Sequence, residues 1–417
     1  MKFPLTRHPF ADLNLAGDDA KHLSSLADDL VASTLRERDD LDLVPLRRPD
    51  ERRWRRVRRL NGSIELHRER DAFVPSRPPS FLVVGQLGCS LDDLLYSVSA
   101  STTEAQRVRS SFAPDGLLDC QLLHTIVEPT PMDPLRHLVL QWSVMGTTSR
   151  ARSIVQHPRD YVVLDGAGFL EAPNEDAPRG GFWVRHSVDL DAVPQLKHWR
   201  LTRGQLSMCG VFRELSTGIT EIYMRMFFDP QGPMSKTIAT RIAFEQVHAL
   251  TKLHHCAQMK KLVMAVRDRE YRTLKQTEHE SRPEDDDTSL LHRPDDGSGE
   301  ACLACKRPMA IASTHHCSLC CRAICRSCRI RRELSFMGRY NRILRTKMSF
   351  CTACIALAIH RDAARVATQE LAHNFLLSES SPAPVSRSTA TLFSTQLSVA
   401  SSRRSSAFQS NELLSFA

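Results

Sequence analysis

Eight cysteines near the C-terminal end of the chain are the residues whose types and spacing most clearly define a chemistry. They form four Cys-x-x-Cys pairs, Cys302/Cys305, Cys317/Cys320, Cys325/Cys328 and Cys351/Cys354. A Cys-x-x-Cys turn places both sulfurs on one side of a tight backbone loop, so each pair supplies half of a tetrahedral shell and needs a second pair. The eight thiolates therefore predict two zinc sites, with two Zn²⁺ ions as cofactors.

The spacing of the pairs is compatible with two topologies, because 11, 4 and 22 residues separate them. In a sequential arrangement the first two pairs hold one ion and the last two pairs hold the other. In a cross-brace the first and third pairs share one ion, and the second and fourth share the other. Either way four thiolates fill each shell, which leaves no position for a catalytic water.

The other five cysteines, Cys89, Cys120, Cys209, Cys256 and Cys321, are expected to be unpaired thiols, the first four in an apolar core. A disulfide framework is disfavoured, because the N-terminus lacks the apolar segment of a secretory signal. No stretch approaches the roughly 20 apolar residues that a membrane-spanning helix needs. A cytoplasmic location is therefore expected.

Positive charge is concentrated on the cysteine-rich module. The formal net charge of the 417-residue chain is +8, yet residues 301–356 contain eleven Lys or Arg against a single acid, Glu333. An anionic partner for this module, such as an acidic membrane surface, is the natural inference.

The run from His315 to Cys328, His-His-Cys-Ser-Leu-Cys-Cys-Arg-Ala-Ile-Cys-Arg-Ser-Cys, resembles the central signature of FYVE zinc fingers. The resemblance covers residues 301–356. It implies the cross-brace, with Cys302, Cys305, Cys325 and Cys328 on the first zinc and Cys317, Cys320, Cys351 and Cys354 on the second. It also implies recognition of phosphatidylinositol 3-phosphate on endosomal membranes, for which His315, His316 and Arg322 are the headgroup candidates.

Several positions depart from the FYVE pattern. The chain has no Trp-x-x-Asp element before Cys302, and Ser313-Thr314 stand where the family has basic residues. Ser318 replaces a basic residue, Cys321 replaces a glycine, and Ser349-Phe350 replace Arg-Val. A 3-phosphate needs several converging charged donors. We therefore expect zinc binding to be intact, phosphoinositide recognition to be weak or lost, and diffuse attraction to acidic lipids to remain.

The region before the cysteine module begins with a helix and a hairpin. Leucines at helical spacing predict an amphipathic helix over residues 18–37. The arginine-rich run 52–59 precedes an Asn61-Gly62 turn and an alternating strand. Its arginines are therefore expected on a solvated strand or helix end, with no nucleic-acid partner.

Further helices and strands follow this hairpin. Ser90 and Asp93 predict the start of a helix that runs toward Ser110. The helical spacing of apolar residues predicts one long helix over 235–272 that covers an antiparallel sheet. The predicted strands of that sheet are residues 81–85, 138–144, 160–164, 181–187, 205–212 and 219–227.

The order of these elements over residues 18–272 resembles the START lipid-transfer domain, an α+β helix-grip fold. The supporting residues are Trp54 before the turn, the run 158–164, Ser187 with Pro194, and the run 229–233 before the last helix. The resemblance implies one hydrophobic ligand, a sterol or phospholipid, between the sheet and the C-terminal helix. Arg159 or Asp160 would lie near it, unless they form a structural ion pair.

The predicted organisation is an N-terminal segment (1–17), a START-like domain (18–272), an acidic flexible linker (273–300), a FYVE-type finger (301–356), a helix (357–377) and a Ser-rich disordered tail (378–417). No catalytic constellation stands out, so we expect a non-enzymatic peripheral membrane or adaptor protein. The alternatives are a protein-interaction scaffold of the FYVE-related Rab-effector type and a RING-like ubiquitin ligase.

Overall fold

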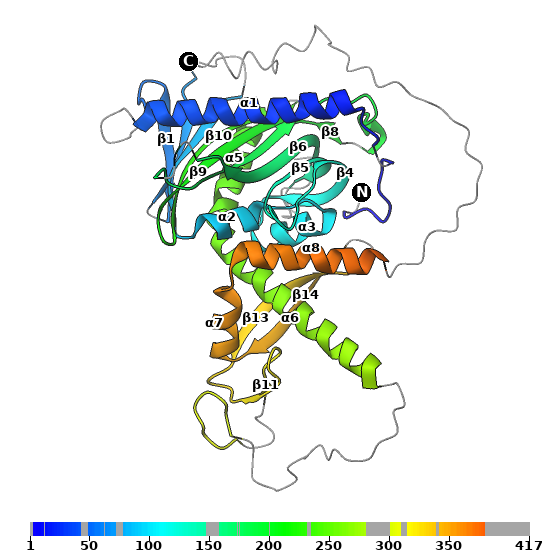
Figure 1. The fold of residues 1–417 in the computed structure, drawn as a ribbon. Coiled ribbons are helices and arrows are strands. Elements are labelled where there is room, and N and C mark those ends of the chain that lie inside the picture. The colour runs from blue at the N-terminus through cyan, green and yellow to red at the C-terminus, as the bar shows by residue number, and fades with distance from the viewer. Residues whose placement is uncertain are drawn as a thin grey trace, which may run out of the picture.

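The computed structural model describes residues 3–11, 13–42, 49–61, 63–71, 78–146, 158–172, 174, 176–199, 201–231, 235–280, 301–309, 315–338 and 342–379. A curved antiparallel sheet dominates it, with strand order β1-β2-β3-β10-β9-β7-β6-β5-β4 and a short β8 that pairs in parallel with β6 (Figure 1). The strands are β1 Trp54–Leu60, β2 Ile64–Glu69, β3 Ser80–Leu87, β4 Leu117–Val127, β5 His137–Met145, β6 Arg159–Leu170, β7 Gly180–Ser187, β8 Thr202–Arg203, β9 Gln205–Ser216 and β10 Ile219–Asp229.

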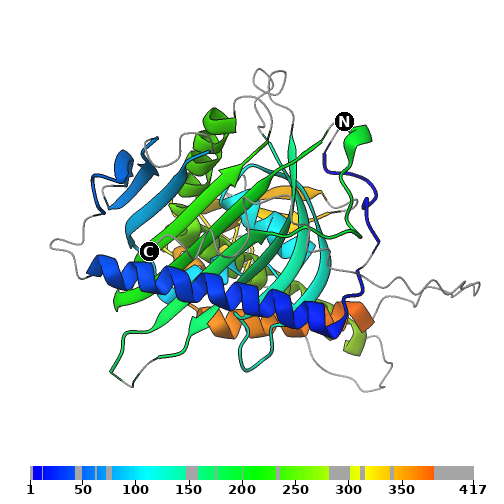
Figure 2. The ribbon, with the colours of Figure 1, turned by 90° about the horizontal axis from the view of Figure 1, so that it is seen from above.

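Helices cover both faces of the sheet. Helix α1, Gly17–Asp42, crosses the outer face (Figure 2) and buries Leu23, Leu30 and Val31 against outward-facing strand residues. The inner face packs on α2 Leu91–Val98, α3 Thr103–Phe112 and α5 Ser235–Leu250, and α6 Leu253–Glu280 packs on α2 and α3. Because both faces are covered, all nine residues of β5 are buried. The predicted α+β helix-grip class is confirmed.

The predicted hairpin between β1 and β2 is confirmed. Asn61 has a φ of 48°, in the left-handed region that such turns require, and the Ser63 amide donates to the Leu60 carbonyl. Residues 55–59 of β1 are exposed, as predicted for the arginine-rich run.

The predicted single helix from Ser90 toward Ser110 is two helices. Ser90 caps α2 by accepting from the Asp93 amide, as expected. Ser99 is then extended, and the Thr102 hydroxyl accepts from the Ala105 amide to cap α3. Thr102 interrupts the predicted helix, because an N-cap residue has an extended, non-helical backbone.

The predicted helix over 235–272 is also divided, at Thr251 and Lys252, and its second part extends to Glu280. Leu250 and Leu253, on either side of the turn, are both buried. The turn lets α5 pack on β10 while α6 packs on α2 and α3. Residues 273–280 of the predicted linker are thus helical, and residues 281–300 lie outside the described part of the chain.

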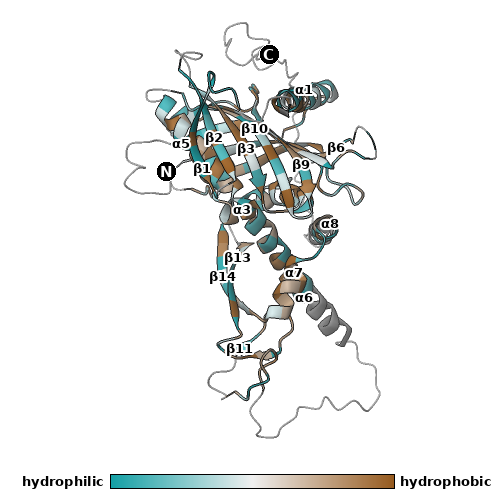
Figure 3. Ribbon diagram, turned by 90° about the vertical axis from the view of Figure 1, so that its left-hand side faces the viewer, coloured by the Kyte–Doolittle hydropathy of each residue, from teal (hydrophilic) through white to brown (hydrophobic). Residues whose placement is uncertain are grey.

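The cysteine-rich module contains four short strands, β11 His315–His316, β12 Ala323–Ile324, β13 Ile330–Met337 and β14 Ile343–Phe350, followed by α7 Thr352–Ile359 and α8 Ala363–Glu379. The helix predicted over 357–377 is therefore two helices. Helix α6 leaves the sheet and passes along α7, β13 and α8 (Figures 1 and 3). Residues 380–417, most of the predicted tail, lie outside the described residues.

Module and sheet share one apolar core. The buried cluster that contains Leu95 of α2 and Leu262 of α6 continues through Phe350, Ile355 and Val366. The finger is therefore packed against the helix-grip body in this structure.

Substitution of Gly85 tests the sheet directly. Gly85 in β3 has a φ of +145°, and an added Cβ would lie 2.0 Å from the Ser63 carbonyl oxygen. We expect Gly85→Ala to lower the free energy of unfolding by at least about 2 kcal/mol, measured by urea denaturation. Gly88, where a Cβ meets nothing within 4 Å, is the matched control. Gly88→Ala should change stability by no more than about 1 kcal/mol, and equal effects at both sites would contradict the strain at Gly85.

Candidate metal centre and buried polar cluster

The structure brings the eight paired cysteines together in two groups of four. Group 1 contains Cys302, Cys305, Cys325 and Cys328, and group 2 contains Cys317, Cys320, Cys351 and Cys354; within each, all four sulfurs lie within 4.8 Å of one another. The first pair thus meets the third, and the second meets the fourth. This is the cross-brace, and the sequential pairing is excluded.

The sulfur separations fit a tetrahedral metal site. The Cys305 and Cys325 sulfurs are 3.8 Å apart in group 1, and the Cys320 and Cys351 sulfurs are 4.0 Å apart in group 2. A tetrahedron with zinc–sulfur bonds of about 2.3 Å has edges of about 3.8 Å. Each group could therefore hold one metal ion with little movement.

Backbone amides point at the sulfurs. In group 1 the Cys325 amide donates to Cys302 Sγ at 3.3 Å, and in group 2 the Cys351 amide donates to Cys317 Sγ at 3.4 Å. The Cys354 amide donates to Cys351 Sγ, which makes Cys351 the N-cap of α7. Such bonds favour the thiolate form and hold each sulfur toward the centre of its group.

The residue after each of the first two Cys-x-x-Cys pairs has a left-handed backbone conformation. Lys306 has a φ of 59° and Cys321 a φ of 58°. This conformation turns the chain back over the sulfurs and costs a residue with a side chain about 1 kcal/mol. The glycine of the FYVE pattern at the Cys321 position is explained by this geometry.

The thiols of one group do not ionise together without a metal. Amide hydrogen bonds from Cys305 and Cys325 lower the pKa of Cys302 to about 6. Hydrogen bonds with Cys325 and Cys305 raise the pKa of Cys328 to about 12. In group 2, burial and the neighbouring Cys351 raise the pKa of Cys354 strongly. A divalent cation is needed for all four sulfurs to be thiolates.

The three headgroup candidates lie beside group 2. His315 and His316 form β11, which pairs with β12, and Arg322 is exposed in the intervening turn. Partial burial, followed by the charges of Arg329, Arg331 and Arg326, lowers the pKa of His315. The basic residues of the finger therefore gather around this strand.

Arg159 and Asp160 have structural partners. Asp160 is buried, accepts from the Trp142 indole at 3.0 Å and pairs with Arg203 at 2.8 Å. Arg159 donates to the Pro230 carbonyl. Asp160 is thus part of the structural ion pair that was the alternative to a ligand role.

A buried polar cluster on the inner face of the sheet was missed from the sequence. At its centre, fully buried Asp165 of β6 accepts from Gln141 at 2.6 Å and from the Trp183 indole at 3.2 Å, and Arg185 Nε lies 3.0 Å away. His137 lies 3.8 Å from the same carboxylate. Burial alone would raise the pKa of Asp165, but His137, Arg185 and the Arg109 charge lower it to about 2.

Several polar atoms of this inner face have no hydrogen-bond partner among the described residues. They are Arg109 Nη2, His137 Nδ1 and Nε2, Ser143 Oγ, Tyr161 Oη and Arg185 Nη1. Nearly all can donate, and all are buried. Buried polar groups are normally satisfied by protein, water or ligand. These donors are therefore suited to form hydrogen bonds with acceptor atoms of a bound molecule.

A signal for the cluster was present in the sequence. His137, Gln141 and Ser143 alternate along β5, and Asp165 and Arg185 interrupt apolar strands at inward positions. Polar residues at core-facing positions of a strand are departures from the binary pattern. Only the register of β5, β6 and β7 shows that they meet.

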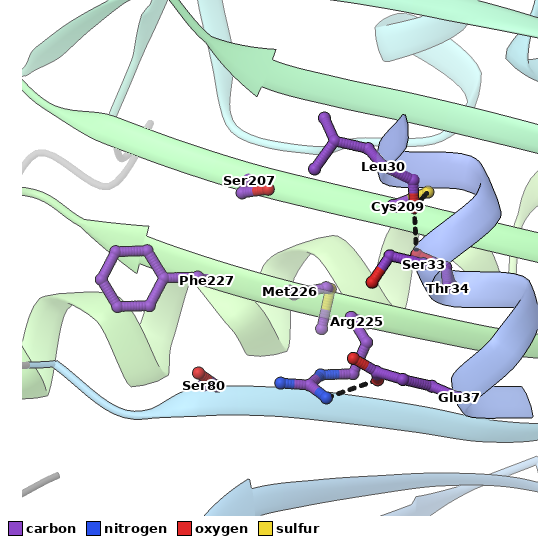
Figure 4. A pocket seen from close by; sticks show the side chains of 10 residues that line it. All are labelled: Leu30, Ser33, Thr34, Glu37, Ser80, Ser207, Cys209, Arg225, Met226 and Phe227. Carbon is purple, nitrogen blue, oxygen red and sulfur yellow. Dashed lines mark hydrogen bonds and ion pairs between the residues drawn. The ribbon is translucent and has the colours of Figure 1, made fainter. Parts of the chain in front are cut away.

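Two hollows lie on the other face, beneath α1. One, about 30 Å³ in volume, is lined by residues including Thr34, Ser207 and Cys209 and is bordered by the Arg225–Glu37 ion pair (Figure 4). It has room for about one water. The other, about 190 Å³, lies near Trp54. The guanidinium groups of Arg53 and Arg225 lie 5.3 and 5.0 Å from the centre of the Trp54 ring. Neither is part of the inner cluster.

Comparisons with known proteins give similarities in fold. No protein-family model and no curated protein matches the sequence. Human StAR-related lipid transfer protein 5 aligns at 12% identity and a TM-score of 0.42, over 57% of this chain and 97% of that one. Human STARD10 aligns at 11% identity and a TM-score of 0.37, over 61% and 84%. A STAR-related lipid transfer protein from Xanthomonas axonopodis aligns at 14% and 0.35, over 48% and 96%.

Within the described residues, no helix combines the length and the apolar character needed to cross a lipid bilayer.

Metal affinity should depend on pH with a definite sign. Because Cys328 and Cys354 keep their protons well above neutral pH in the metal-free chain, binding at pH 7 must release at least one proton per group. Each proton released raises the apparent affinity by a factor of about ten per pH unit. We expect competition with a chelator at pH 6, 7 and 8 to show affinity rising with pH at both sites. An affinity independent of pH would contradict binding by these thiols.

Proposed function

We propose that this protein is a non-enzymatic zinc protein that holds an amphipathic lipid inside its helix-grip body and attaches peripherally to acidic membranes, such as the cytoplasmic face of endosomes. The observation that carries the proposal is the set of buried donors on the inner face of the sheet, around Asp165 and farther along β5 and β6, that have no hydrogen-bond partner among the described residues.

Zinc is the metal that the two cysteine groups favour. Four thiolates with tetrahedral separations suit zinc, whereas calcium and magnesium require oxygen ligands. The described cysteines are free of disulfides. Both ions would act structurally, since each shell is closed by protein sulfur.

The polar end of the ligand would lie at the Asp165 cluster. Arg109 and Arg185 each pair with a carboxylate, yet each retains an N–H with no hydrogen-bond partner among the described residues. Tyr161 and Ser143, paired with each other four residues farther along the sheet, add hydroxyls to the same face. A ligand oxygen, from a sterol hydroxyl, an ester or a phosphate, would satisfy these donors. The apolar remainder would contact inward-facing residues of β10 and α5, such as Met224, Met226 and Ile242.

Membrane attachment would use the basic finger. Arg322, Arg326 and Arg331 are exposed near His315 and His316. Near an anionic leaflet each such charge contributes about 1 kcal/mol. Specific recognition of phosphatidylinositol 3-phosphate is proposed to be weak, because Ser318 and Cys321 replace residues of the lipid-reading motif.

Tyr161→Phe tests the ligand site with little risk to the fold. The Tyr161 hydroxyl is buried without a hydrogen-bond partner in the described structure, so its removal should leave the unliganded protein as stable or more stable by about 1 kcal/mol. Removal should weaken binding of a fluorescent phospholipid or sterol by about five- to tenfold, because the bound ligand would lose a hydrogen bond from that hydroxyl.

Tyr223→Phe is the matched control. Tyr223 lies on the outer face and donates to Glu37 at 3.1 Å. This variant should lose about 1 kcal/mol of stability while keeping its ligand affinity. Unchanged affinity in Tyr161→Phe, or equal losses in both variants, would count against a ligand at the inner cluster.

Flotation with vesicles tests the membrane proposal. Vesicles containing phosphatidylserine should carry the full chain, less so at high salt, and added phosphatidylinositol 3-phosphate should give little gain. Arg326→Gln with Arg331→Gln should weaken binding by about tenfold or more. Arg55→Gln with Arg59→Gln, an equal charge change on β1, should have little effect. Absence of binding to any acidic vesicle would exclude this part of the proposal.

A further inference from the structure

We infer that metal in group 2, but not in group 1, controls the packing of α6 on α2 and of α2 on the proposed ligand-bearing sheet, so that the finger regulates the body to which it is attached. The inference rests on the proposed zinc occupancy of group 2.

The chain of contacts begins at Cys351. Its sulfur is a member of group 2 and also caps α7 by accepting from the Cys354 amide. When a metal draws the four sulfurs together, it fixes the first turn of α7. When the metal is absent, the four sulfurs are no longer bonded to a common ion, and the first turn of α7 loses that constraint.

Helix α7 passes this constraint to α6. Ile355 and Ala358 are buried in the same apolar cluster as Met259 and Leu262 of α6. At the end of α7, the Ile359 carbonyl accepts from Lys261 Nζ at 3.2 Å. A second link comes from Arg269 of α6, which donates to the Ser318 carbonyl between the first two sulfurs of group 2.

Lys261 joins three helices. It is only 3% exposed, and its ammonium also lies 2.6 Å from Asp93 in the first turn of α2. A buried charge is stable only while its partners stay in place. Loss of the Ile359 carbonyl would therefore disturb the pair that ties α6 to α2.

A parallel contact is made by α8. The Tyr96 hydroxyl of α2 donates to Glu370 of α8 at 2.5 Å. Lys260 of α6 donates to the Tyr96 carbonyl at 2.7 Å and lies 4.0 Å from the centre of the Tyr96 ring. Helix α2 is thus held by α6 and α8 together.

Helix α2 reaches the ligand-bearing strand. A Cβ added to Gly181 of β7 would lie 3.1 Å from side-chain atoms of Leu91 and Leu95, so α2 packs directly on β7. Trp183 and Arg185, which contact Asp165, follow on the same face of β7. A shift of α2 would therefore move β7 and change the contacts of Trp183 and Arg185 with Asp165.

Group 1 provides an internal control. The apolar cluster that joins finger and body includes Cys317 and Cys351 of group 2, with Cys320 and Cys354 packed against it, but no cysteine of group 1. Cys328 and Cys354 are equally suited to comparison, because each is the last cysteine of its group and each is partly exposed.

The test compares Cys354→Ser with Cys328→Ser in the full chain, with zinc measured by elemental analysis and protection by hydrogen exchange. We expect amides of α2 and of residues 259–268 to exchange about tenfold faster or more in Cys354→Ser. Cys328→Ser should leave them within about twofold of the wild type. Equal changes in the two variants, or none in Cys354→Ser, would overturn the inference.

Lys261→Met tests whether the coupling between group 2 and α2 passes through Lys261. Added to Cys354→Ser, it should produce less additional exchange in α2 than it does alone, because both changes break the same link. Fully independent effects would show that the coupling does not pass through Lys261.

If Cys354→Ser does not fold, the wild-type chain is followed during chelation. Residues 351–359 and α2 should then lose protection in one phase, and separate phases would overturn the inference. A wild-type chain without zinc would instead contradict the proposed function, which separates the two failures.

Discussion

Four sulfurs held within 4.8 Å of one another are the constraint on which the C-terminal third of the structure depends. Thiolates this close repel, and without a cation some of them remain protonated, as Cys328 and Cys354 do. A metal ion bound by the four sulfurs would replace this repulsion with bonds. The positions of the sulfurs constrain β11, β12 and the start of α7, so a metal ion in each group would replace the large apolar core that such a short segment cannot build.

The finger nevertheless has a second support, the surface of α6. Consecutive lysines of that helix, Lys260 and Lys261, are buried, which is costly unless every ammonium proton has an acceptor. Lys260 uses carbonyls at the end of α2, where the helix dipole favours a cation. Lys261 uses Asp93 and the Ile359 carbonyl. These partners come from both sides of the interface, so the finger and the body complete each other's hydrogen bonding.

What the sequence could predict was local. The cysteine spacing, the Asn61-Gly62 turn and the leucine stripe of α1 depend on neighbouring residues, and each was recognised. The helix breaks at Ser99 and Thr251 carry neither Gly nor Pro; the first is set by the Thr102 cap of α3, and the second lets α5 and α6 pack on different elements. The Asp165 cluster and the Lys261 node join residues from distant strands and helices, and no local pattern shows such meetings. The cross-brace itself was settled by resemblance to a known motif, since the spacing allowed two pairings.

The departures from the FYVE pattern gain a physical meaning from the docked position of the finger. Two of them, Ser318 and Cys321, are the residues that contact Arg269 of α6. The contact at Ser318 is made by its backbone carbonyl and does not depend on the side chain at that position. Where the pattern has glycine, the Cys321 thiol accepts a hydrogen bond from that guanidinium and offsets part of the cost of its left-handed backbone. The Ser318 carbonyl and the Cys321 thiol thus attach this part of the finger to α6 through one guanidinium, and only the second contact depends on the side chain that departs from the pattern.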